Sequence, residues 1–583
     1  MWWTRYALST IAAKTNPSHN KEAWLVEKIW LKNYPQGVPA EIDPNKYQSI
    51  VDIFEQTCKR YKNLPAFYNL GVTLTFQEID EQSRIFASYL QNVLHLKKGD
   101  RLAIMLPNVL QYPIALFGAL RAGLTVVNVN PLYTPPELVH QMRDSGTEAI
   151  LVLANFAATV KEALPDTPLK HVIIAEVGDL LPQPKAFLIN FILKYIQKKV
   201  PRISIPQAIS FKEAMAQGKR HTFRSVEVNN QDIAFLQYTG GTTGIAKGAM
   251  LTHRNIVANI LQGETWFSPV LERGKEIIIT ALPLYHIFSL TANCFFIFEM
   301  GGLNVLITNP RDLPSMISEM SKFKFTIITG VNTLFNGLLK NPKFAQLDFS
   351  DLKLCLGGGM ALQKTVAEKW QAVTGVSLLE AYGLTETSPC VTINPPDLKQ
   401  YNGTVGLPVS STDVRILDEE GKDVGFNQSG ELAVKGPQVM YGYWRNPAET
   451  QKVFTQDGWL LTGDIASIDE QGYVRIRERK KDMILVSGFN VYPNEIEDVI
   501  ARLHGVKEVA VIGIPDEGSG EVVKAFIVKD DANLTVSDVL RYCHKNLTNY
   551  KVPKYVEFAD DLPKSNVGKI LRRVLRDGIA APL

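Results

Sequence analysis

The strongest constraint on the fold is the repeated alternation of short apolar strands with amphipathic helices along most of the chain. A capping box at Thr75-Phe76-Gln77-Glu78, with a hydroxyl three residues before a carboxylate, starts one such helix. The helix ends near Gly99-Asp100, and the buried strand Arg101–Leu106 follows it. Further strands are predicted at Val126–Val129, Ala149–Leu153, His171–Ile174, Ile233–Gln237, Glu276–Thr280, Val305–Thr308, Phe325–Thr329 and Leu352–Leu356. This alternation predicts an α/β fold of layered, largely parallel sheets.

The pattern changes after about residue 400, and the change predicts a division into domains. Gly403–Pro447 is rich in glycine, proline and short alternating segments, as in a β-rich subdomain of a large N-terminal domain. Arg475–Met483 is a dense run of charge between apolar segments, and it is either a solvated turn or a hinge. A compact α/β pattern follows it. We therefore predict an N-terminal extension (1–27), a large domain (28–477), a hinge (478–483) and a small, mobile C-terminal α/β domain (484–583).

Charge and cysteine content disfavour several classes of protein. The 583 residues include 62 lysines and arginines against 59 aspartates and glutamates, a net charge of +3, so nucleic acid is a poor default partner. The five cysteines are scattered without CxxC or other ligand-like spacing, which disfavours a disulfide framework and a cysteine zinc site. These features predict a cytoplasmic protein.

Two uncharged stretches approach the length of a transmembrane helix. Ala103–Leu120 is interrupted by Pro107 and Pro113, and Ala281–Phe298 by a proline, a histidine and an asparagine. Such breakers and polar groups favour buried strand-to-helix segments of a large core. The first residues lack a run of positive charge followed by a long apolar core, so we interpret them as an extension rather than a signal peptide.

A glycine- and threonine-rich loop, Tyr238-Thr-Gly-Gly-Thr-Thr-Gly-Ile-Ala-Lys-Gly248, is the strongest local signal of chemistry. Its glycines allow several backbone N–H groups to turn toward one anion, and its hydroxyls and lysine add donors and charge, as in a phosphate-binding loop. The GK[ST] ending of a Walker A loop is absent, because Ala246 precedes Lys247 and Gly248 follows it. For the loop alone, a generic glycine-rich turn is the alternative.

Four further segments have a similar character. Leu356-Gly-Gly-Gly-Met360 follows a strand and lets a flat ligand approach the backbone. Tyr382-Gly-Leu-Thr-Glu386 offers an aromatic ring, a hydroxyl and a carboxylate able to reach a hard cation. Thr462-Gly-Asp464 supplies a carboxylate suited to two ribose hydroxyls, and Pro563-Lys-Ser-Asn-Val-Gly-Lys569 places a lysine after a flexible turn. Each segment is weak alone, but their joint order is highly specific.

Together these segments resemble the adenylate-forming family of acyl-CoA synthetases, luciferases and nonribosomal adenylation domains. The resemblance extends from about Trp30 to Arg576 and is strongest to the bacterial long-chain fatty-acid–CoA ligases. Its supporting segments are QYTGGTTGIAKGAMLTHRN (237–255), ALPLYHIF (281–288), EAYGLTET (380–387), DGWLLTGDIASIDEQGYVRIRERKK (457–481), MILVSGFNVYPNEIEDV (483–499) and LPKSNVGKILRR (562–573). The stretch 457–481 is similar to the segment characteristic of the fatty-acid branch.

The resemblance implies a set of nucleotide-binding residues. The β- and γ-phosphates of ATP would lie against Thr239, Gly240, Gly241, Thr242, Thr243, Gly244 and Lys247. The adenine slot would be lined by Gly357, Gly358, Gly359 and Tyr382. The other nucleotide-binding residues would be Thr385, Asp464 at the ribose hydroxyls, Arg479 beside it and Lys481 in the hinge.

The same resemblance implies the catalytic groups. Thr239 and Glu386 would hold Mg²⁺, and His286 would lie near the reacting carboxylate. Lys569 would be a mobile catalytic lysine that, with Mg²⁺, neutralises the charge developing as pyrophosphate leaves. The hinge would deliver Lys569 for adenylation and later bring Ser487-Gly488-Phe489-Asn490 toward the pantetheine arm of CoA.

Plainer interpretations exist for some of these side chains. The alternative for His286 is a satisfied core histidine, and for Lys247 a solvated loop lysine. A functional interpretation is better supported for Glu386, since a carboxylate in an apolar, glycine-containing turn needs a partner. Two departures from the family pattern concern local contacts and chain length: Leu485 replaces an expected lysine, and Ile287-Phe288-Ser289-Leu290 lacks the tryptophan that gates the acyl tunnel in some long-chain members.

A segment of a different kind is Lys185–Arg202 (KAFLINFILKYIQKKVPR). One apolar helical face is formed by Phe187, Leu188, Phe191, Ile192, Tyr195 and Ile196. The segment adds five positive charges and no acidic residue, the composition of a helix that lies on anionic lipid at the inner face of a membrane. The alternative is a helix packed on the core with solvated lysines.

We therefore predict an ATP- and Mg²⁺-dependent ligase of fatty acid metabolism that converts medium- or long-chain fatty acids to acyl-CoA through an acyl-adenylate. One alternative is an adenylating enzyme that passes the acyl group to a carrier protein, which an insertion around residues 465–485 would have favoured. A non-catalytic fatty-acid uptake or binding protein is disfavoured by the intact Thr239, Glu386, Asp464 and Lys569. The missing GK[ST] ending disfavours a P-loop kinase. Nothing in the residue chemistry specifies chain length or oligomeric state.

Overall fold

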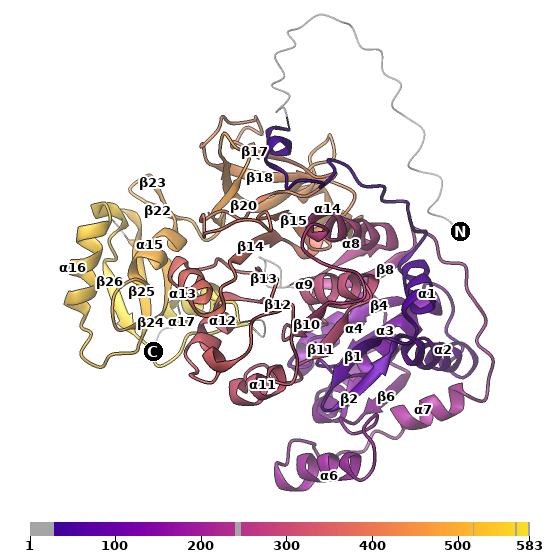
Figure 1. Cartoon of the computed structure of the whole chain (residues 1–583). Coiled ribbons are helices and arrows are strands. Elements are labelled where there is room, and N and C mark those ends of the chain that lie inside the picture. The colour runs from indigo at the N-terminus through magenta and orange to yellow at the C-terminus, as the bar shows by residue number, and fades with distance from the viewer. Residues whose placement is uncertain (1–27, 240–245, 517, 566–567, 581–583) are drawn as a thin grey trace, which may run out of the picture.

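The computed structural model describes residues 28–239, 246–516, 518–565 and 568–580. Figure 1 shows a large domain, in indigo to orange, joined to a small C-terminal domain in yellow. The large domain holds two mostly parallel sheets and one antiparallel sheet, and the small domain has a sheet of its own. The predicted layered α/β class is confirmed.

One sheet of the large domain supports the glycine-rich loop. Its strands, in the order β19-β9-β8-β4-β3-β5-β6-β7, are Gly442–Tyr443, Lys247–Thr252, Ile233–Thr239, Thr125–Asn128, Arg101–Met105, Ala149–Leu153, His171–Ala175 and Ala208–Ser210. The six strands from β8 to β7 run parallel, and β9 returns antiparallel to β8. Thr239 at the end of β8 is paired with Lys247 at the start of β9, so the sheet fixes both ends of the loop.

The second sheet presents two glycine-containing turns at one edge. Its strands, in the order β16-β15-β14-β13-β12-β10-β11-β1-β2, are Leu407–Pro408, Cys390–Ile393, Leu378–Gly383, Leu354–Gly357, Ile327–Gly330, Ile277–Thr280, Leu303–Leu306, Pro65–Asn69 and Val72–Thr75. β13 and β14 are parallel neighbours and end at Gly357 and Gly383. Because the carboxyl ends of parallel strands meet at one edge, the loops after these strands open into the same space.

Helices surround the two sheets. In the large domain they are α1 (Ile50–Tyr61), α2 (Phe76–Asn92), α3 (Gln111–Arg121), α4 (Pro135–Ser145), α5 (Ala157–Ala163), α6 (Lys185–Phe191), α7 (Phe211–Gly218), α8 (His253–Phe267), α9 (Ile287–Ser289), α10 (Phe296–Glu299), α11 (Leu313–Met320), α12 (Asn332–Leu339), α13 (Lys364–Thr374) and α14 (Pro447–Val453). The predicted capping box is confirmed at α2, where Thr75 and Glu78 cap each other. The largest core cluster joins α1, α2, α3 and α8 to both sheets.

The third sheet is the β-rich subdomain, which appears in orange in Figure 1. It is antiparallel and contains β17 (Asp413–Leu417), β18 (Gly430–Lys435), β20 (Leu460–Ile468) and β21 (Val474–Arg479). The structure differs here from the predicted turn or hinge, because Arg475–Arg479 continues β21. Pairing with β20 satisfies its backbone, and Asp464 faces Arg479 across the ladder. The connection to the small domain is therefore the turn that begins at Lys480.

The small domain is built on a sheet of five strands. These are β22 (Ile484–Val486), β23 (Phe489–Val491), β24 (Val506–Asp516), β25 (Gly520–Lys529) and β26 (Tyr555–Phe558). Its helices are α15 (Pro493–Ile500), α16 (Val536–Asn546) and α17 (Arg572–Ala580). A separate buried cluster, centred on β22, β24, β25, α15 and α16, gives the small domain its own core.

The two uncharged segments that approach the length of a transmembrane helix belong to the core of the large domain. Residues 103–120 run from β3 into α3, and residues 281–298 form the loop after β10, α9, the π-helix Leu290–Phe295 and part of α10. Across the residues that the structure describes, no helix has both the length and the apolarity needed to cross a membrane.

An aromatic anchor joins the start of the described chain to the β-rich subdomain. The Trp30 side chain is 2% exposed. A Cβ added at Gly472, in the turn between β20 and β21, would lie 2.6 Å from the Trp30 Cα atom. Tyr34 donates a hydrogen bond to the Pro408 carbonyl at 2.5 Å, and Lys28 forms an ion pair with Asp413 at 2.8 Å. The segment after residue 28 thus ties the antiparallel sheet to the rest of the large domain.

Replacing Trp30 by alanine should lower the free energy of unfolding by about 3–5 kcal/mol, because it removes a large buried aromatic side chain. Urea denaturation followed by circular dichroism would measure this. The control Val373→Ala, at an exposed position of α13, should change stability by no more than about 0.5 kcal/mol. Equal losses in the two variants would contradict the anchoring role of Trp30.

Candidate active site in the cleft between the domains

A cavity of about 2300 Å³ lies where the two large sheets, the β-rich subdomain and the small domain meet. The cavity is lined by twelve of the predicted residues: Thr239, Lys247, His286, Gly358, Gly359, Tyr382, Thr385, Glu386, Asp464, Arg479, Lys481 and Lys569. The predicted loop residues Gly240, Gly241, Thr242, Thr243 and Gly244 lie outside the described residues. Gly357 is not among the residues that line the cavity; it lies in β13 and pairs with Gly330 and Glu380 on its two sides.

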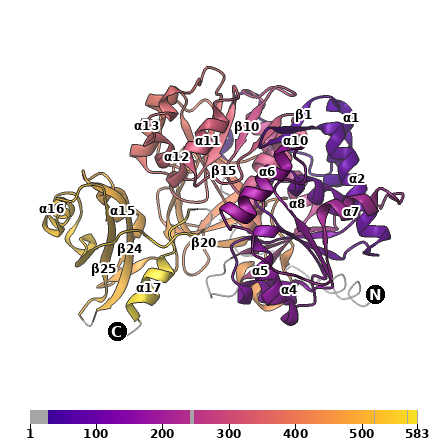
Figure 2. The same ribbon diagram turned by 90° about the horizontal axis from the view of Figure 1, so that it is seen from below.

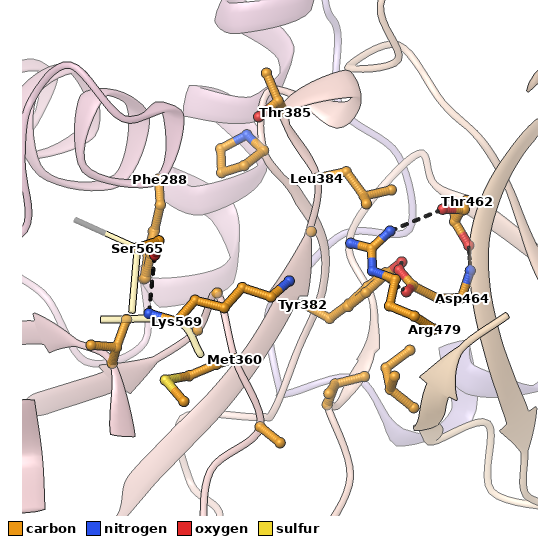
Figure 3. A pocket seen from close by; sticks show the side chains of 18 of the residues that line it. Phe288, Met360, Tyr382, Leu384, Thr385, Thr462, Asp464, Arg479, Ser565 and Lys569 are labelled. Carbon is orange, nitrogen blue, oxygen red and sulfur yellow. Dashed lines mark hydrogen bonds and ion pairs between the residues drawn. The ribbon is translucent and has the colours of Figure 1, made fainter. Parts of the chain in front are cut away.

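A tyrosine, a carboxylate and a guanidinium form one wall, as Figure 3 shows. The Tyr382 hydroxyl donates to Asp464 Oδ2 at 2.5 Å, and Arg479 Nε lies 2.8 Å from Asp464 Oδ1. Arg479 also donates to the Thr462 carbonyl at 3.4 Å. Burial, together with the nearby Asp464 charge, raises the pKa of Tyr382 well above its ordinary value, so the phenol keeps its proton and remains a donor. The Asp464 carboxylate is thereby oriented toward the cavity by two neighbours.

The glycines after β13 leave room for a flat group beside Tyr382. A Cβ at Gly358 would lie 3.1 Å from the Phe288 ring and 3.3 Å from the Ala381 carbonyl. Gly359 has φ +78°, a backbone conformation that other residues rarely adopt. A side chain at either position would narrow the slot or strain the turn. The slot for a planar ring at Gly358 and Gly359 stays a prediction.

The glycine-rich loop ends beside an ion pair that the sequence reasoning missed. The Lys247 ammonium pairs with the Glu449 carboxylate of α14 and lies 5.4 Å from the centre of the Tyr443 ring. Hydrogen bonds from Lys247 and Lys452 lower the pKa of Glu449 to about 2. Lys247 is therefore not a freely solvated lysine, and Glu449 holds it at the mouth of the loop. Glu449 lies some 200 positions along the chain from Lys247, so no local pattern pointed to it.

The residues predicted to hold Mg²⁺ provide few protein ligands. Glu386 lies in the 3-10 turn Thr385–Thr387, and its Oε1 accepts a hydrogen bond from the Tyr443 hydroxyl at 2.7 Å. This turn contacts β8, the strand that ends at Thr239. No cluster of three or more histidine, cysteine, aspartate or glutamate side chains suited to a metal occurs within the described ranges. One carboxylate and one hydroxyl fit Mg²⁺, which is commonly held by one or two carboxylates and completed by substrate phosphates.

Lys569 enters the cavity from the small domain, on a tight loop. The Ser565 N–H donates to the Lys569 carbonyl at 2.6 Å, and the Lys569 N–H donates to Ser565 Oγ at 3.1 Å. Gly568 has φ +81°, and a Cβ there would lie 2.6 Å from Thr333 Oγ1 on α12. Glycine thus lets the loop approach the large domain closely. In Figure 3 the Lys569 side chain extends toward Tyr382 and Arg479.

The electrostatics of the cleft shift two of its bases. Desolvation in the cleft, reinforced by the like charge of Arg479, lowers the pKa of Lys569 to about 8, although Asp464 opposes the shift. Burial and the nearby Lys569 charge lower the pKa of His286 to about 4, so this imidazole is neutral at physiological pH. His286 Nδ1 accepts a hydrogen bond from the Phe288 N–H at 3.3 Å, which places the ring proton on Nε2. His286 is therefore a neutral donor at the cavity wall.

A partly buried arginine just after Lys569, with its side chain 14% exposed, joins this part of the small domain to the large domain. Arg572 lies 2.9 Å from Glu478 on β21, and 2.8 Å from Glu497 and 2.6 Å from Asn494, both on α15. Arg576 pairs with Asp482 in the turn between the domains. These contacts join α17 to the last strand of the large domain and to the connecting turn. The sequence signal was the paired arginines of LPKSNVGKILRR, which carried no assigned role.

One arm of the cavity is apolar, and the sequence reasoning did not identify it. It lies between α8, the helical segment around Phe296, and the strands β15 and β16. Its residues are Gly263, Phe267, Ala292, Phe296, Ile393, Val405 and Val409. A Cβ at Gly263 would lie 3.6 Å from the Phe296 ring, so the missing side chain leaves space in this arm. The signal is spread over four distant segments, which is why no single motif revealed it.

Glu380 lines the cavity, whereas one predicted segment, Ser487–Asn490, lies away from it. Burial raises the pKa of the Glu380 carboxyl to about 8, and Glu380 Oε1 accepts a hydrogen bond from the Leu362 N–H at 3.1 Å. The predicted segment Ser487–Asn490 is not at the cavity. It forms the turn between β22 and β23 and the first two residues of β23. Phe489 is 56% exposed, and its ring stacks on that of Tyr550 with the ring centres 4.7 Å apart.

Comparisons with known proteins identify the family of the chain. The family model described as AMP-binding enzyme matches residues 54–444, and the model described as AMP-binding enzyme C-terminal domain matches residues 495–569. A curated long-chain-fatty-acid–CoA ligase of Yersinia pestis is 58% identical over 552 residues, which cover 95% of this chain and 98% of that protein.

Solved structures share the whole fold. The crystal structure of ATP-bound MatB from Rhodopseudomonas palustris is 29% identical, covers 91% of this chain and 98% of that chain, and has a TM-score of 0.79. The crystal structure of the anthranilate CoA ligase AuaEII in complex with anthranoyl-AMP is 25% identical, covers 93% of this chain and all of that chain, and has a TM-score of 0.80.

The charge coupling in the cleft predicts how Lys569 titrates. An amine-directed acylating reagent should modify Lys569 with a midpoint near pH 8, because a lysine reacts only when it is neutral. Arg479→Met removes a like charge and should raise this midpoint, whereas Asp464→Asn removes an opposite charge and should lower it. Mass spectrometry of the Lys569 peptide, normalised to exposed lysines of the same digest, would measure both. A midpoint near 10.5 in all three proteins would contradict the coupling.

Proposed function

The chain belongs to the AMP-binding enzyme family, and we propose that it activates medium- and long-chain fatty acids to acyl-CoA through an acyl-adenylate, with release of AMP and pyrophosphate. The observation that carries the proposal is the meeting of Lys569, the Asp464–Arg479 pair and Glu386 around one cavity that also has an apolar arm. The 58% identity to a long-chain-fatty-acid–CoA ligase over nearly the full length of both chains supports the same activity.

The first half-reaction joins two anions. A carboxylate oxygen of the fatty acid attacks the α-phosphorus of ATP, a new P–O bond forms, and the P–O bond to pyrophosphate breaks. Lys569 neutralises charge on the attacking and bridging oxygens, and no nucleophilic side chain is needed. The neutral His286 donates its Nε2 proton toward a carboxylate oxygen and orients it. The aliphatic chain lies in the apolar arm, whose residues Phe267, Phe296 and Val409 are at most 5% exposed.

The nucleotide is held by polar groups on three sides. Asp464 accepts hydrogen bonds from the ribose hydroxyls, and Tyr382 and Arg479 fix its orientation. The ring of Tyr382 and the glycines Gly358 and Gly359 enclose the adenine. Thr239 and Lys247 bind the phosphates at the ends of the glycine-rich loop. With Thr239 and Glu386 as protein ligands, bound Mg²⁺ supplies positive charge to the phosphate oxygens.

The second half-reaction needs a different set of groups. The CoA thiol loses its proton to water, its sulfur attacks the acyl carbon to form a C–S bond, and the C–O bond to AMP breaks. Lys569 is no longer required at this stage, and the turn from Lys480 to Asp482 allows the small domain to rotate away. Rotation brings the hairpin turn Ser487–Asn490 to the pantetheine arm. In the present arrangement Lys569 is in the cavity and the hairpin is outside it, as adenylation requires.

Transfer to a carrier protein is the less favoured alternative. The segment from β20 to β22 has only short connections, without an insertion that would serve as a docking site. A protein that only binds fatty acids would have no use for the Asp464–Arg479 pair or for a lysine delivered by a second domain. Free CoA is therefore the acceptor we propose.

The proposed place of action is the cytoplasm and, through peripheral attachment, the inner face of the cell membrane. Free fatty acids with long chains partition into bilayers. An enzyme bound at the membrane surface therefore meets its substrate at a higher local concentration. This location is a proposal separate from the ligase chemistry.

Replacing Lys569 by alanine should slow adenylation by about 10²–10³-fold, because a charge-stabilising donor is lost. Fatty-acid-dependent exchange of labelled pyrophosphate into ATP would measure it, with Lys545→Ala on the exposed face of α16 as the control. Thioester formation from preformed acyl-AMP should be far less affected. An exchange rate equal to that of the wild type would overturn the role of Lys569.

Replacing Lys481 by proline should slow one half-reaction far more than the other, because proline fixes φ near −65° and stiffens the turn between the domains. The two rates are pyrophosphate exchange and thioester formation from preformed acyl-AMP. Lys481→Ala removes the same side chain and keeps the backbone free, so it separates the two effects. Equal losses in both half-reactions would count against a domain rotation at this turn.

A further inference from the structure

Five large apolar side chains stand in solvent on one short segment of the large domain. They are Phe187 (68% exposed), Leu188 (55%), Phe191 (41%), Tyr195 (49%) and Ile196 (65%), on α6 and the π-helix Ile192–Ile196 that continues it. We refer to these five residues as the α6 face. They make up a third of the fifteen large apolar side chains that are exposed in the described part of the chain. Such a concentration on a soluble domain marks a surface that contacts a partner.

Polar contacts hold the opposite side of α6 against the domain. Asn190 accepts a hydrogen bond from the Gly178 N–H at 2.9 Å and donates to Glu176 at 2.7 Å. Lys185 donates to the Leu70 carbonyl at 2.6 Å, and Ala186 is 1% exposed. The helix thus uses its polar and small residues for attachment and turns its apolar residues outward. This is the reverse of a helix packed on the core, which was the alternative interpretation of the sequence.

The aromatic residues of the α6 face form an ordered row. The ring centres of Phe187 and Phe191 are 6.0 Å apart, and those of Phe191 and Tyr195 are 5.0 Å apart. Rings that already contact one another lose little further freedom when a partner covers them. The row is therefore prepared for burial in an apolar medium rather than for a single small ligand.

The charges around the α6 face specify the kind of partner. Lys194, Lys198, Lys199 and Arg202 are exposed, and residues 185–202 contain no acidic side chain. No ion pair ties any of these four to a carboxylate among the described residues. Exposed aromatic and aliphatic side chains beside several cations match the interface of a bilayer that contains anionic phospholipid.

The position of α6 allows a flat partner surface, such as a membrane, to reach the α6 face. In Figure 1 α6 projects from the bottom of the large domain, away from the small domain and the β-rich subdomain. Figure 2, which views the molecule from below, shows α6 in front of the domain with no other element covering it. A membrane can therefore meet the α6 face while the small domain remains free to rotate.

We infer that the α6 face docks the protein on anionic phospholipid, with the apolar row in the interface and the four cations at the headgroups. The inference deepens the proposed membrane location and does not depend on the ligase chemistry. Its partner is a lipid surface rather than a second copy of the chain, because the four like charges of a self-complementary patch would repel those of the second copy.

Sedimentation with phosphatidylcholine vesicles, with and without phosphatidylglycerol, tests the inference on the full-length protein. Wild type should bind the anionic vesicles more tightly than the neutral ones. Lys194→Gln, Lys198→Gln and Lys199→Gln together should weaken this binding by on the order of 100-fold, since each lysine near an anionic surface contributes about fivefold. Phe187→Ser with Phe191→Ser should weaken binding to both kinds of vesicle.

Two matched controls keep the result interpretable. Phe426→Ser with Tyr555→Ser removes two exposed aromatic residues elsewhere, and it should leave vesicle binding unchanged. Circular dichroism and turnover of octanoate, which is soluble without lipid, should match the wild type in every variant. Should octanoate turnover be absent in the wild type as well, the ligase proposal fails while the vesicle result still decides the docking surface.

Three outcomes would overturn the inference. The first is vesicle binding that is equal in the wild type and in both α6 variants. The second is wild-type binding that is indifferent to phosphatidylglycerol. The third is a wild-type dimer, measured by light scattering, that Phe187→Ser with Phe191→Ser dissociates while vesicle binding is absent, which would assign the α6 face to a second copy of the chain.

Discussion

Lys569 and Arg479 are two cations that line one partly desolvated cleft, and the cost of holding positive charge there governs the electrostatics of the site. Desolvation in the cleft, with the like charge of Arg479 as the second cause, lowers the pKa of Lys569 to about 8, and the single carboxylate of Asp464 only partly offsets the shift. The cleft becomes electrostatically favourable when polyphosphate and carboxylate anions share it. In the proposed mechanism, binding of anionic substrates and closure of the small domain are coupled, because the anions offset the cations of the cleft and the cations offset the anions.

The fold supplies the rigidity that such an arrangement needs. β20 and β21 hold Asp464 opposite Arg479, and β13 and β14 deliver their glycine-containing turns to one edge. The small domain is tied to the large domain at a different point, where Arg572 joins Glu478 and Glu497. A rotation of the small domain would have to exchange the contacts around Arg572 and Asp482, so these ion pairs set how firmly the adenylating arrangement is held. The inferred attachment to lipid through α6 would leave this exchange unhindered.

Local patterns predicted the fold class and many of the cavity residues. Strands such as Ala149–Leu153 and the capping box before α2 depend on neighbours within a few positions, and these were confirmed. Thr239, Tyr382, Asp464 and Lys569 were located by their motifs, and the structure brings all four to one cavity.

What the sequence did not reveal depends on contacts between distant segments. The run Arg475–Arg479 has the composition of a solvated turn, yet β20 pairs with it and makes it a strand. Glu449, which pairs with Lys247, lies in a part of the chain that carries no motif. The same is true of Tyr443, which donates a hydrogen bond to Glu386. Whether α6 is packed or exposed could not follow from its periodicity, because an amphipathic pattern does not say which face meets the domain.

The most direct test of the account is the release of AMP and pyrophosphate by the wild-type protein given ATP, Mg²⁺ and palmitate, measured with and without CoA. The account predicts that continuous AMP release requires CoA and yields palmitoyl-CoA in equal amount. Pyrophosphate formation that is indifferent to CoA would retain adenylation but contradict CoA as the acceptor. An absence of turnover with fatty acids of any chain length would contradict the central claim.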